Sequence, residues 1–333
     1  MQDSDYTRFT EGLFDEDLQD QQIDFESEID ELYNNVGEYR KSAKFRKILD
    51  FCSKFRSVAP FNAMLIELQR PGCELILTGR QWLLRFNRMI RPNAQPLLYL
   101  NRTPVGAMYD ISDTVSMDNN GMTDQEIIDE VAHPFKRDGD FDERILKTMI
   151  ENLQYFGIAY DLNFNASGRF GAYISKQPVS TVVCFRHRGQ SATFKWTMPY
   201  FVSINKEAHP LQAMQSLCHE LGHFFCHHLP PETSDWWVMR RHDKIIREFE
   251  AETTAYMVCK RNGIPCPNSE AYLAHYAEEN KEIPHNISVE TVMKAVSAIE
   301  KMFVPMSWSD GYLYKRDAAF KERLKRERSG LSR

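Results

Sequence analysis

The chain has 333 residues, of which 42% are hydrophobic and 26% charged, a composition typical of a globular protein with more than one domain. Its seven cysteines are odd in number and form no C-x-x-C pair, which disfavours a disulfide framework and favours the cytoplasm. We expect no membrane span and no secretory signal, because apolar runs are short and the N-terminus is acidic and polar.

The formal net charge of −6 hides an uneven distribution along the chain. Residues 1–39 carry 13 acidic side chains and one basic one, whereas residues 40–102 carry 13 Lys or Arg and three acids. The last 19 residues hold eight basic and three acidic side chains. A basic segment beside an acidic one indicates a polyanionic partner, or that one segment covers the other.

The apolar pattern predicts an α+β protein whose parts follow one another along the chain. A helical pattern begins near residue 36. Further helices are expected over 61–68, 142–156, 211–228, 243–261, 269–278 and 289–302, and strands over 74–78, 95–100, 179–185 and 197–204. The predicted parts are an acidic, flexible leader (1–39), a small α/β basic domain (40–115), a linker (116–140), a mainly helical domain with a small sheet (141–310) and a basic tail (311–333).

One predicted helix contains the motif H-E-x-x-H, formed by His219, Glu220 and His223. Residues four apart share a helix face, so both imidazoles can bind one metal ion. Glu220 would lie beside the open coordination position, where it can take a proton from water and pass it to a leaving amine. Histidine ligands with an open position favour a catalytic Zn²⁺ site. The alternative is two surface histidines on an amphipathic helix.

The third ligand is expected on the following helix. Glu248 and Glu252 are four apart and share a face, while Glu250 points elsewhere. We expect Glu248 to bind the metal and Glu252 to orient a histidine, although the reverse assignment and three solvated acids are both open alternatives. His227 and His228 are expected to cap carbonyls or pack rather than bind metal.

A peptidase must hold its substrate extended, and the predicted strand over 197–204 directly precedes the motif helix. Tyr200 and Val202 of this strand are therefore predicted to lie where a substrate backbone could pair.

The sequence around the motif resembles the ImmA/IrrE group of metallopeptidases. The similar residues are the run from His219 to Phe225, a further histidine at 227 or 228, and Glu248-x-x-Ala251-Glu252, within residues 140–262. The family usually has Asn or Asp where this chain has Glu252. The resemblance implies a zincin-like fold and a zinc-dependent endopeptidase of the gluzincin type, acting on a regulatory or defence protein.

The basic segment, over about 40–105, resembles the N-terminal domain of ArdC-type antirestriction proteins. The similar runs are Asn62 to Pro71 and Thr78 to Trp82. The resemblance implies single-stranded DNA binding coupled to a zincin-like domain, with roles in antirestriction, stress or control of mobile elements. Independently, basic residues mixed with aromatic ones suit a single strand, whose phosphates and bases they can contact. The predicted DNA-binding residues are Asn62, Gln69, Arg80, Trp82, Arg85, Arg88 and Arg91, the alternative being a core of aromatics under a solvated charged face.

Three functions are open at this stage. The first is a DNA-responsive metallopeptidase. The second is a non-catalytic protein that protects single-stranded DNA and has a structural zinc site, but such a site would have no use for Glu220. The third is a nuclease, which is weaker because one His/His/Glu site lacks the clustered carboxylates of two-metal nucleases.

Overall fold

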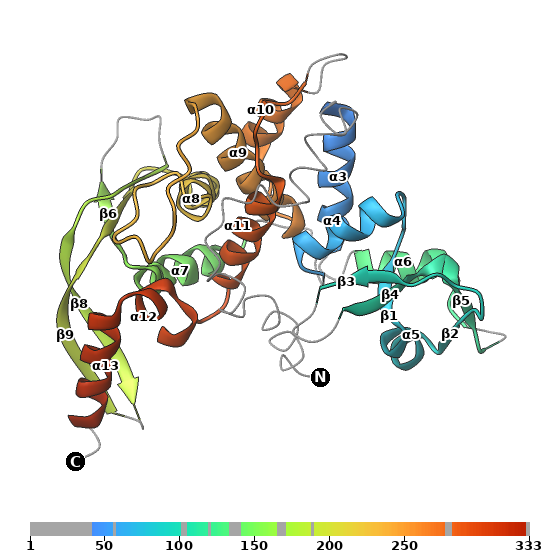
Figure 1. Ribbon diagram of the computed structural model, residues 1–333, viewed down its shortest axis with the longest axis horizontal. Helices are drawn as coiled ribbons and strands as arrows, with labels where there is room; N and C mark the ends of the chain where they lie inside the picture. The colour runs from blue at the N-terminus through green and yellow to red at the C-terminus, as the bar shows by residue number, and fades with distance from the viewer. Residues whose placement is uncertain are drawn as a thin grey trace. The chain divides into compact units, whose positions relative to one another are not determined.

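The computed structural model describes residues 42–55, 58–100, 105–118, 121–132, 141–164, 171–187, 190–276 and 282–330 (Figure 1). They form two compact units. Unit 1 comprises Met1–Asp140, Lys260–Gly263 and Ala274–His285, and unit 2 comprises Phe141–Cys259, Ile264–Leu273 and Asn286–Arg333. The predicted α+β class, mainly helical with small sheets, is confirmed. The acidic leader predicted over 1–39 lies outside the described residues.

Unit 1 is built from short elements around an apolar core. Its elements are α3 (Ser42–Lys54), α4 (Pro60–Gln69), β1 (Ile76–Thr78), α5 (Gly79–Phe86), β2 (Arg88–Ile90), β3 (Leu97–Tyr99), β4 (Gly106–Asp110), η2 (Ile111–Asp113), β5 (Thr114–Ser116) and α6 (Asp124–Ala132). Two antiparallel sheets, β1-β4-β3 and β2-β5, form within it. The segment predicted as a linker thus contains β5's end and helix α6. The phenylalanines spaced along α3 and α4 are buried, as a core face requires.

Unit 2 carries the H-E-x-x-H helix, α8. Its elements are α7 (Glu143–Asn152), η3 (Leu153–Phe156), β6 (Ile158–Phe164), β7 (Ala172–Ser175), β8 (Val179–His187), β9 (Gln190–Met198), β10 (Tyr200–Asn205), α8 (Pro210–Phe225), α9 (Lys244–Arg261), α10 (Pro267–Tyr276), α11 (Val289–Lys301), η4 (Trp308–Asp310), α12 (Tyr312–Arg316) and α13 (Ala318–Gly330). The last residues of α9 and α10 are counted with unit 1.

A three-stranded sheet supports α8. Its order is β6-β10-β7, with β10 parallel to β6 and antiparallel to β7. The sequence predicted one strand over 197–204, but that stretch holds the end of β9 and most of β10, and Pro199 separates them. Proline lacks the N–H that would continue a strand's hydrogen bonding, so the chain turns from the hairpin into the sheet here.

Helix α13 lies beside the long hairpin of β8 and β9 (Figure 1). Phe194 and Trp196 alternate along β9 and both contact Phe320, their ring centroids lying 5.8 and 5.3 Å from it. The segment predicted as a basic tail is therefore largely helical, because Phe320 and Leu324 are buried one turn apart on α13. In the described part of the chain, no helix is long and apolar enough to cross a membrane.

Candidate metal centre

Helix α8 begins with a recognisable local signal. His209 is its N-cap and accepts a hydrogen bond from the backbone N–H of Leu211 at its Nδ1, and Pro210 occupies the first turn, where its missing N–H costs nothing. Leu217, Leu221 and Phe224 are fully buried. These three positions fix the rotation of the helix, so that His219 and His223 lie on its more accessible face with side chains 19% and 16% exposed.

Helix α9 crosses α8 at a very short distance. An added Cβ at Gly222 would lie 3.0 Å from both the Cα and the carbonyl oxygen of Ala251. Glycine therefore permits the close approach, since interaxial distance depends on the side chains at the contact. Glu248 lies one turn before Ala251 on α9, so this close packing places its side chain beside His219 and His223.

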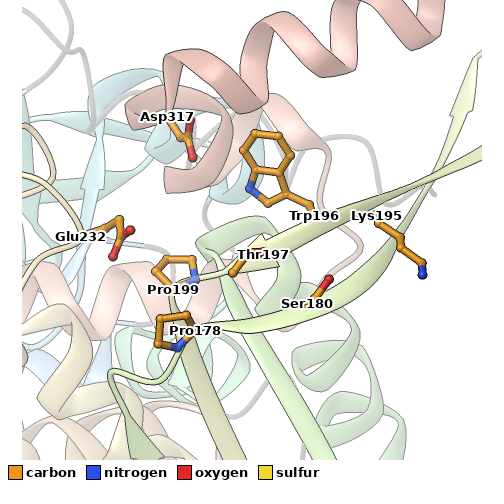
Figure 2. A pocket seen from close by; sticks show the side chains of 8 residues that line it. All are labelled: Pro178, Ser180, Lys195, Trp196, Thr197, Pro199, Glu232 and Asp317. Atoms are coloured by element: carbon orange, nitrogen blue, oxygen red, sulfur yellow. The ribbon is translucent and has the colours of Figure 1, made fainter.

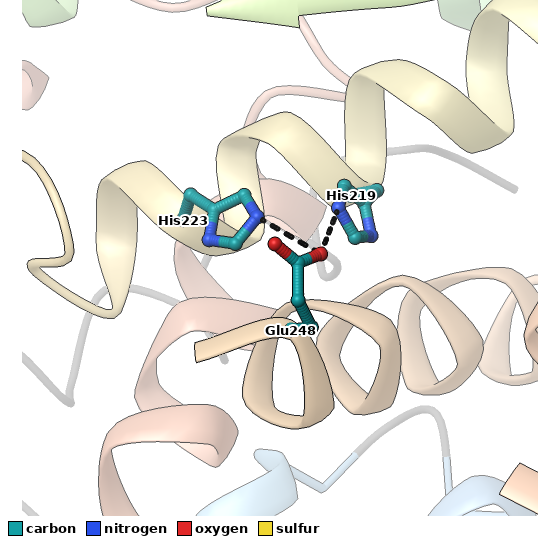
Figure 3. Close-up of side chains that lie close together, drawn as sticks. All are labelled: His219, His223 and Glu248. Atoms are coloured by element: carbon teal, nitrogen blue, oxygen red, sulfur yellow. Dashed lines mark ion pairs between the residues drawn. The ribbon is translucent and has the colours of Figure 1, made fainter. Parts of the chain in front are cut away.

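Figure 3 shows Glu248 of α9 pointing at both imidazoles of α8. Its Oε2 lies 3.5 Å from His219 Nε2 and 3.7 Å from His223 Nε2. The three side chains can offer ligand atoms within 4.8 Å of one another. A tetrahedral zinc with bonds of about 2.1 Å places its ligand atoms roughly 3.4 Å apart, so the donor set and its spacing fit this ion.

The electrostatics of the cluster favour a cation. Burial alone would lower the pKa of His219, but Glu248 and Glu252 outweigh it and raise that pKa to about 10. Contacts with His219 and His223 hold the pKa of Glu248 well below its usual range. Glu252 Oε1 lies 3.3 Å from His219 Nδ1, within ion-pair distance. Glu252 Oε2 accepts a hydrogen bond from the Ser269 hydroxyl at 2.7 Å.

Glu220 lies between α8 and the sheet. Its Oε2 accepts a hydrogen bond from the Ile174 N–H of β7 at 3.0 Å. Burial raises the pKa of this carboxyl, and the Ile174 hydrogen bond and the two motif histidines oppose the rise. The motif thus places a half-buried carboxylate next to the histidine pair and beside a strand edge.

Sequence reasoning missed two residues of the site, His228 and Glu250. Glu250 was expected to point away from the candidate metal ligands, and it is not part of the group formed by His219, His223 and Glu248. It is completely buried, however, and not solvated. It contacts His228, which in turn contacts His223. His227 packs on Trp237, with the two rings nearly parallel and 5.2 Å apart, and burial lowers its pKa to about 3. The sequence signals for His228 were its place just beyond the motif and the further histidine, at 227 or 228, in the resemblance to the ImmA/IrrE group.

The predicted substrate strand is corrected by the sheet order. Tyr200 and Val202 are fully buried on β10, which is the central strand and pairs with β6 and β7 on its two sides. The Tyr200 hydroxyl donates to the Pro230 carbonyl at 2.8 Å. Within the described part of the chain, β10 thus pairs with a strand on each side, so the prediction that Tyr200 and Val202 pair with a substrate was wrong. Among the described residues, β7 pairs on one side only.

A hollow of about 370 Å³ lies elsewhere in unit 2, at the base of the hairpin (Figure 2). It is lined by Pro178, Ser180, Lys195, Trp196, Thr197, Pro199, Glu232 and Asp317. Its acids are already engaged: Asp317 accepts from the Phe320 N–H, and Glu232 lies 3.4 Å from the Lys176 ammonium. None of the candidate metal ligands lines this hollow, which therefore is not part of the metal centre.

In unit 1, four of the predicted DNA-binding residues hold the fold together instead. The Asn62 amide exchanges two hydrogen bonds with the backbone of Leu100, and the Gln69 amide does the same with Leu98, which satisfies the outer edge of β3. Trp82 is fully buried and its indole N–H donates to the Tyr109 carbonyl, so no base can stack on it.

Arg88 is the fourth correction. It is 5% exposed, its Nε donates to the Thr114 hydroxyl, and its guanidinium pairs with Asp124 at 2.7 Å. The charge of Arg88 is therefore paired with Asp124 and is not available to a nucleic acid. Arg80, Arg85 and Arg91 are exposed, and the Arg85 guanidinium lies over the Phe86 ring at 5.1 Å.

Comparison with known proteins agrees with the class of site that this geometry defines. Residues 173–264 match the model of the IrrE N-terminal-like domain, a peptidase family whose members are typically metal-dependent. The matched segment runs from β7 to just beyond α9 and includes His219, Glu220, His223 and Glu248. No curated protein and no solved structure matches the chain. Unit 2 thus contains a domain similar to peptidases of the ImmA/IrrE type, while the resemblance of unit 1 to ArdC-type proteins stays a prediction.

Proposed function

We propose that the protein is a zinc-dependent endopeptidase that cleaves a regulatory or defence protein. The observation that carries the proposal is the position of Glu248 Oε2 between the Nε2 atoms of His219 and His223, at 3.5 and 3.7 Å. Glu248 is the third ligand in this assignment, and Glu252 orients His219 from behind. The match to a peptidase family over the same residues supports it.

The chemistry follows from the groups around this point. Zinc, when bound here, supplies a Lewis acid that polarises the scissile carbonyl and eases ionisation of water. The Glu220 carboxylate accepts a proton from the attacking water and passes it to the leaving amine. Glu248 is about a third exposed, so the centre is open to a peptide.

The substrate backbone is proposed to lie along β7 instead of β10. β7 is an outer strand of its sheet among the described residues, and its Ile174 N–H contacts Glu220. An extended peptide pairing with this edge would bring its scissile bond beside the same carboxylate.

Replacement of Glu220 by Gln tests the catalytic assignment. The Glu220→Gln variant is expected to keep its zinc and lose cleavage of a proteome-derived peptide library, read by mass spectrometry, by at least about 100-fold. The matched control is Glu207→Gln, an exposed acid near the start of α8. Cleavage by Glu220→Gln at the wild-type rate would exclude the peptidase mechanism.

The metal assignment is tested separately by metal analysis of protein purified without added metal. The Glu248→Ala variant should lose most of its zinc, whereas Glu252→Ala should retain more, because Glu252 contacts His219 at Nδ1 and not at the Nε2 that faces Glu248. The opposite order would exchange the roles of the two glutamates.

A second function, binding of single-stranded DNA by unit 1, is supported by the three exposed arginines Arg80, Arg85 and Arg91. Arg80 and Arg85 lie on α5, and Arg91 directly follows β2, within the most basic part of the sequence. Cationic side chains on such a surface would bind phosphates. A link between DNA binding and cleavage, in antirestriction or stress regulation, belongs to this proposal. A non-catalytic DNA-protecting protein with a structural zinc is the alternative.

Fluorescence anisotropy with a labelled oligothymidylate across a salt series tests this second function. Replacing all three arginines by Ala should weaken binding and reduce the salt slope by up to about 2, because each single-strand phosphate contact contributes roughly 0.7. The control variant replaces Lys315, Lys325 and Arg326, in α12 and α13 of unit 2, and should leave binding unchanged. Absence of binding by the wild type would remove the hypothesis and with it the DNA-protecting alternative.

A further inference from the structure

A chain of buried polar groups extends inward from His223. His223 Nδ1 lies 2.9 Å from His228 Nδ1, and His228 Nε2 lies 2.8 Å from Glu250 Oε2. Arg240 grips the same carboxylate with two nitrogens, at 2.6 and 2.7 Å, and the Ser288 N–H at the start of α11 donates to it at 2.7 Å. His228 is 2% exposed and Glu250 is fully buried.

The charges of Glu250 and Arg240 restrict where the protons of these hydrogen-bonded groups lie. The single negative charge of Glu250 is already compensated by the bidentate guanidinium of Arg240, so a second cation on the buried His228 ring would be uncompensated. A carboxylate can only accept hydrogen bonds. His228 is therefore neutral, with its proton on Nε2 and directed at Glu250.

The direction of the next hydrogen bond follows. With its proton on Nε2, His228 presents a bare Nδ1 and can only accept there. The partner at 2.9 Å, His223 Nδ1, must then be the donor. A neutral His223 that carries its proton on Nδ1 has a lone pair on Nε2, the atom that lies 3.7 Å from Glu248.

We propose that Arg240 and Glu250 act through His228 as a proton-orienting relay, which holds His223 in the tautomer whose Nε2 is free to bind the metal. This inference rests on the proposed zinc site. His228, Glu250 and Arg240 are positioning residues in it, since the proposed metal would be held by His219, His223 and Glu248. The two ligand histidines are thus oriented differently: His219 faces a carboxylate directly, and His223 faces one through a second imidazole.

The same buried group cannot be a second metal site. Cys226, His228 and Glu250 lie close enough together to hold an ion. However, the Arg240 guanidinium occupies both oxygens of Glu250, so an ion there would face a fixed positive charge. The Cys226 thiol, whose pKa burial raises to about 12, pairs with the Thr254 hydroxyl instead. The group is therefore a hydrogen-bonded relay.

The Glu250→Gln variant should reverse the relay. The amide oxygen is expected at the position of Oε1, which faces two fixed donors, the Ser288 N–H and Arg240 Nη2, whereas Oε2 faces one fixed donor, Arg240 Nη1, and His228. The amide nitrogen then replaces the oxygen facing His228 Nε2, and it donates. His228 would shift its proton to Nδ1, and His223 would carry its own on Nε2, where it blocks the metal. Zinc affinity, measured by competition with a chromophoric chelator, should fall about 10- to 100-fold.

Two substitutions at His228 separate hydrogen bonding from ring packing. His228→Asn keeps an oxygen acceptor near the position of Nδ1, whereas His228→Phe keeps the ring but has no acceptor. The His228→Asn variant should bind zinc about tenfold more tightly than the His228→Phe variant. The ¹⁵N shifts of His223 in the metal-free protein should report a proton on Nδ1 in the wild type and on Nε2 in Glu250→Gln.

The control for a general loss of stability is Val296→Ala, which creates a cavity at a fully buried position of α11. This variant should leave zinc affinity unchanged. Wild-type zinc affinity in both Glu250→Gln and His228→Phe would overturn the relay, as would equal losses in His228→Asn and His228→Phe. The proposed metal site is judged separately by Glu248→Ala: if that variant binds zinc as the wild type does, the zinc site itself is wrong.

Discussion

Gly222 of α8 lies directly against the backbone of Ala251 of α9, with room for a hydrogen atom but not for a methyl group at normal contact distance. This relationship sets the separation of the two helices that carry the candidate metal ligands. His219 and His223 flank Gly222 on α8, and Glu248 precedes Ala251 by one turn on α9. The geometry of the candidate metal centre therefore depends on a residue that has no metal-binding side chain.

We predict that Gly222→Ala weakens both the fold and the metal site. The new Cβ would meet two backbone atoms of Ala251 at 3.0 Å, so α8 and α9 must separate. The expected cost in the free energy of unfolding is about 1–3 kcal/mol, and zinc affinity should fall with it. Thermal unfolding with and without zinc measures both quantities.

Two further variants make this prediction specific. Gly330→Ala adds a methyl group on α13 where nothing lies within 4 Å, and should leave both quantities near their wild-type values. The double variant Gly222→Ala, Ala251→Gly should not recover, since the clash is with the backbone of residue 251 and not with its side chain. Full recovery in the double variant would contradict the proposed cause.

The candidate metal ligands could be proposed from the sequence because the spacing within each pair is local. Spacings of four residues on a helix place His219 with His223, and Glu248 with Glu252, on common faces without knowledge of the rest of the fold. The role of Glu250 could not be read in this way. Its burial depends on Arg240 and Ser288, which come from a loop and from the start of another helix.

The strands were harder to predict for the same reason. A run of β-branched and aromatic residues predicts extended backbone, but not which strand lies in the centre of a sheet. Tyr200 and Val202 were placed correctly in a strand and wrongly at an edge. In unit 1, Trp82 and Arg88 look like a nucleic-acid surface by composition, while their burial is a property of the packed domain.

Val202→Pro is predicted to unfold unit 2 instead of merely blocking substrate binding. Val202 is fully buried in the central strand β10 and pairs with Tyr160 and Ile174 on its two sides, so proline would disrupt the sheet that supports α8. Loss of zinc together with loss of cooperative thermal unfolding is the expected result. A folded variant that retains zinc but does not cleave would restore β10 as the substrate strand.

Asn62→Ala and Gln69→Ala are predicted to differ in cost although each removes a pair of hydrogen bonds to β3. Asn62 is 4% exposed, so its two hydrogen bonds with the Leu100 backbone are partly shielded from water, and their loss costs about 1–3 kcal/mol. Gln69 is exposed, and water replaces its contacts with Leu98 at a cost below about 1 kcal/mol. Hydrogen exchange across β3 measures the two effects, and a larger effect at Gln69 would contradict this ranking.

Arg70 and Asp113 make the stability of unit 1 sensitive to acid. Arg70 ends α4 and donates to both oxygens of Asp113, one contact being 3.0 Å, and this pairing lowers the pKa of Asp113 below its ordinary value of 3.8. A carboxyl whose pKa is depressed by folding stabilises the folded state above its unfolded pKa and loses that contribution as the pH falls through the folded pKa. Asp113→Asn should therefore lower the free energy of unfolding by about 1 kcal/mol at pH 7, a modest value because Arg70 is a third exposed.

The pH profile of that difference is the decisive measurement. Below about pH 4 the wild-type carboxyl begins to protonate in the unfolded state, so the gap between wild type and Asp113→Asn should shrink steadily in acid. Urea unfolding followed by hydrogen exchange over residues 60–118 at several pH values gives the gap for unit 1 alone. Asp142→Asn in unit 2 is the control, since its exposed pair with Arg144 should contribute little at any pH. A gap for Asp113→Asn that stays constant from pH 7 to strong acid would show that Arg70 does not recognise the charge of Asp113.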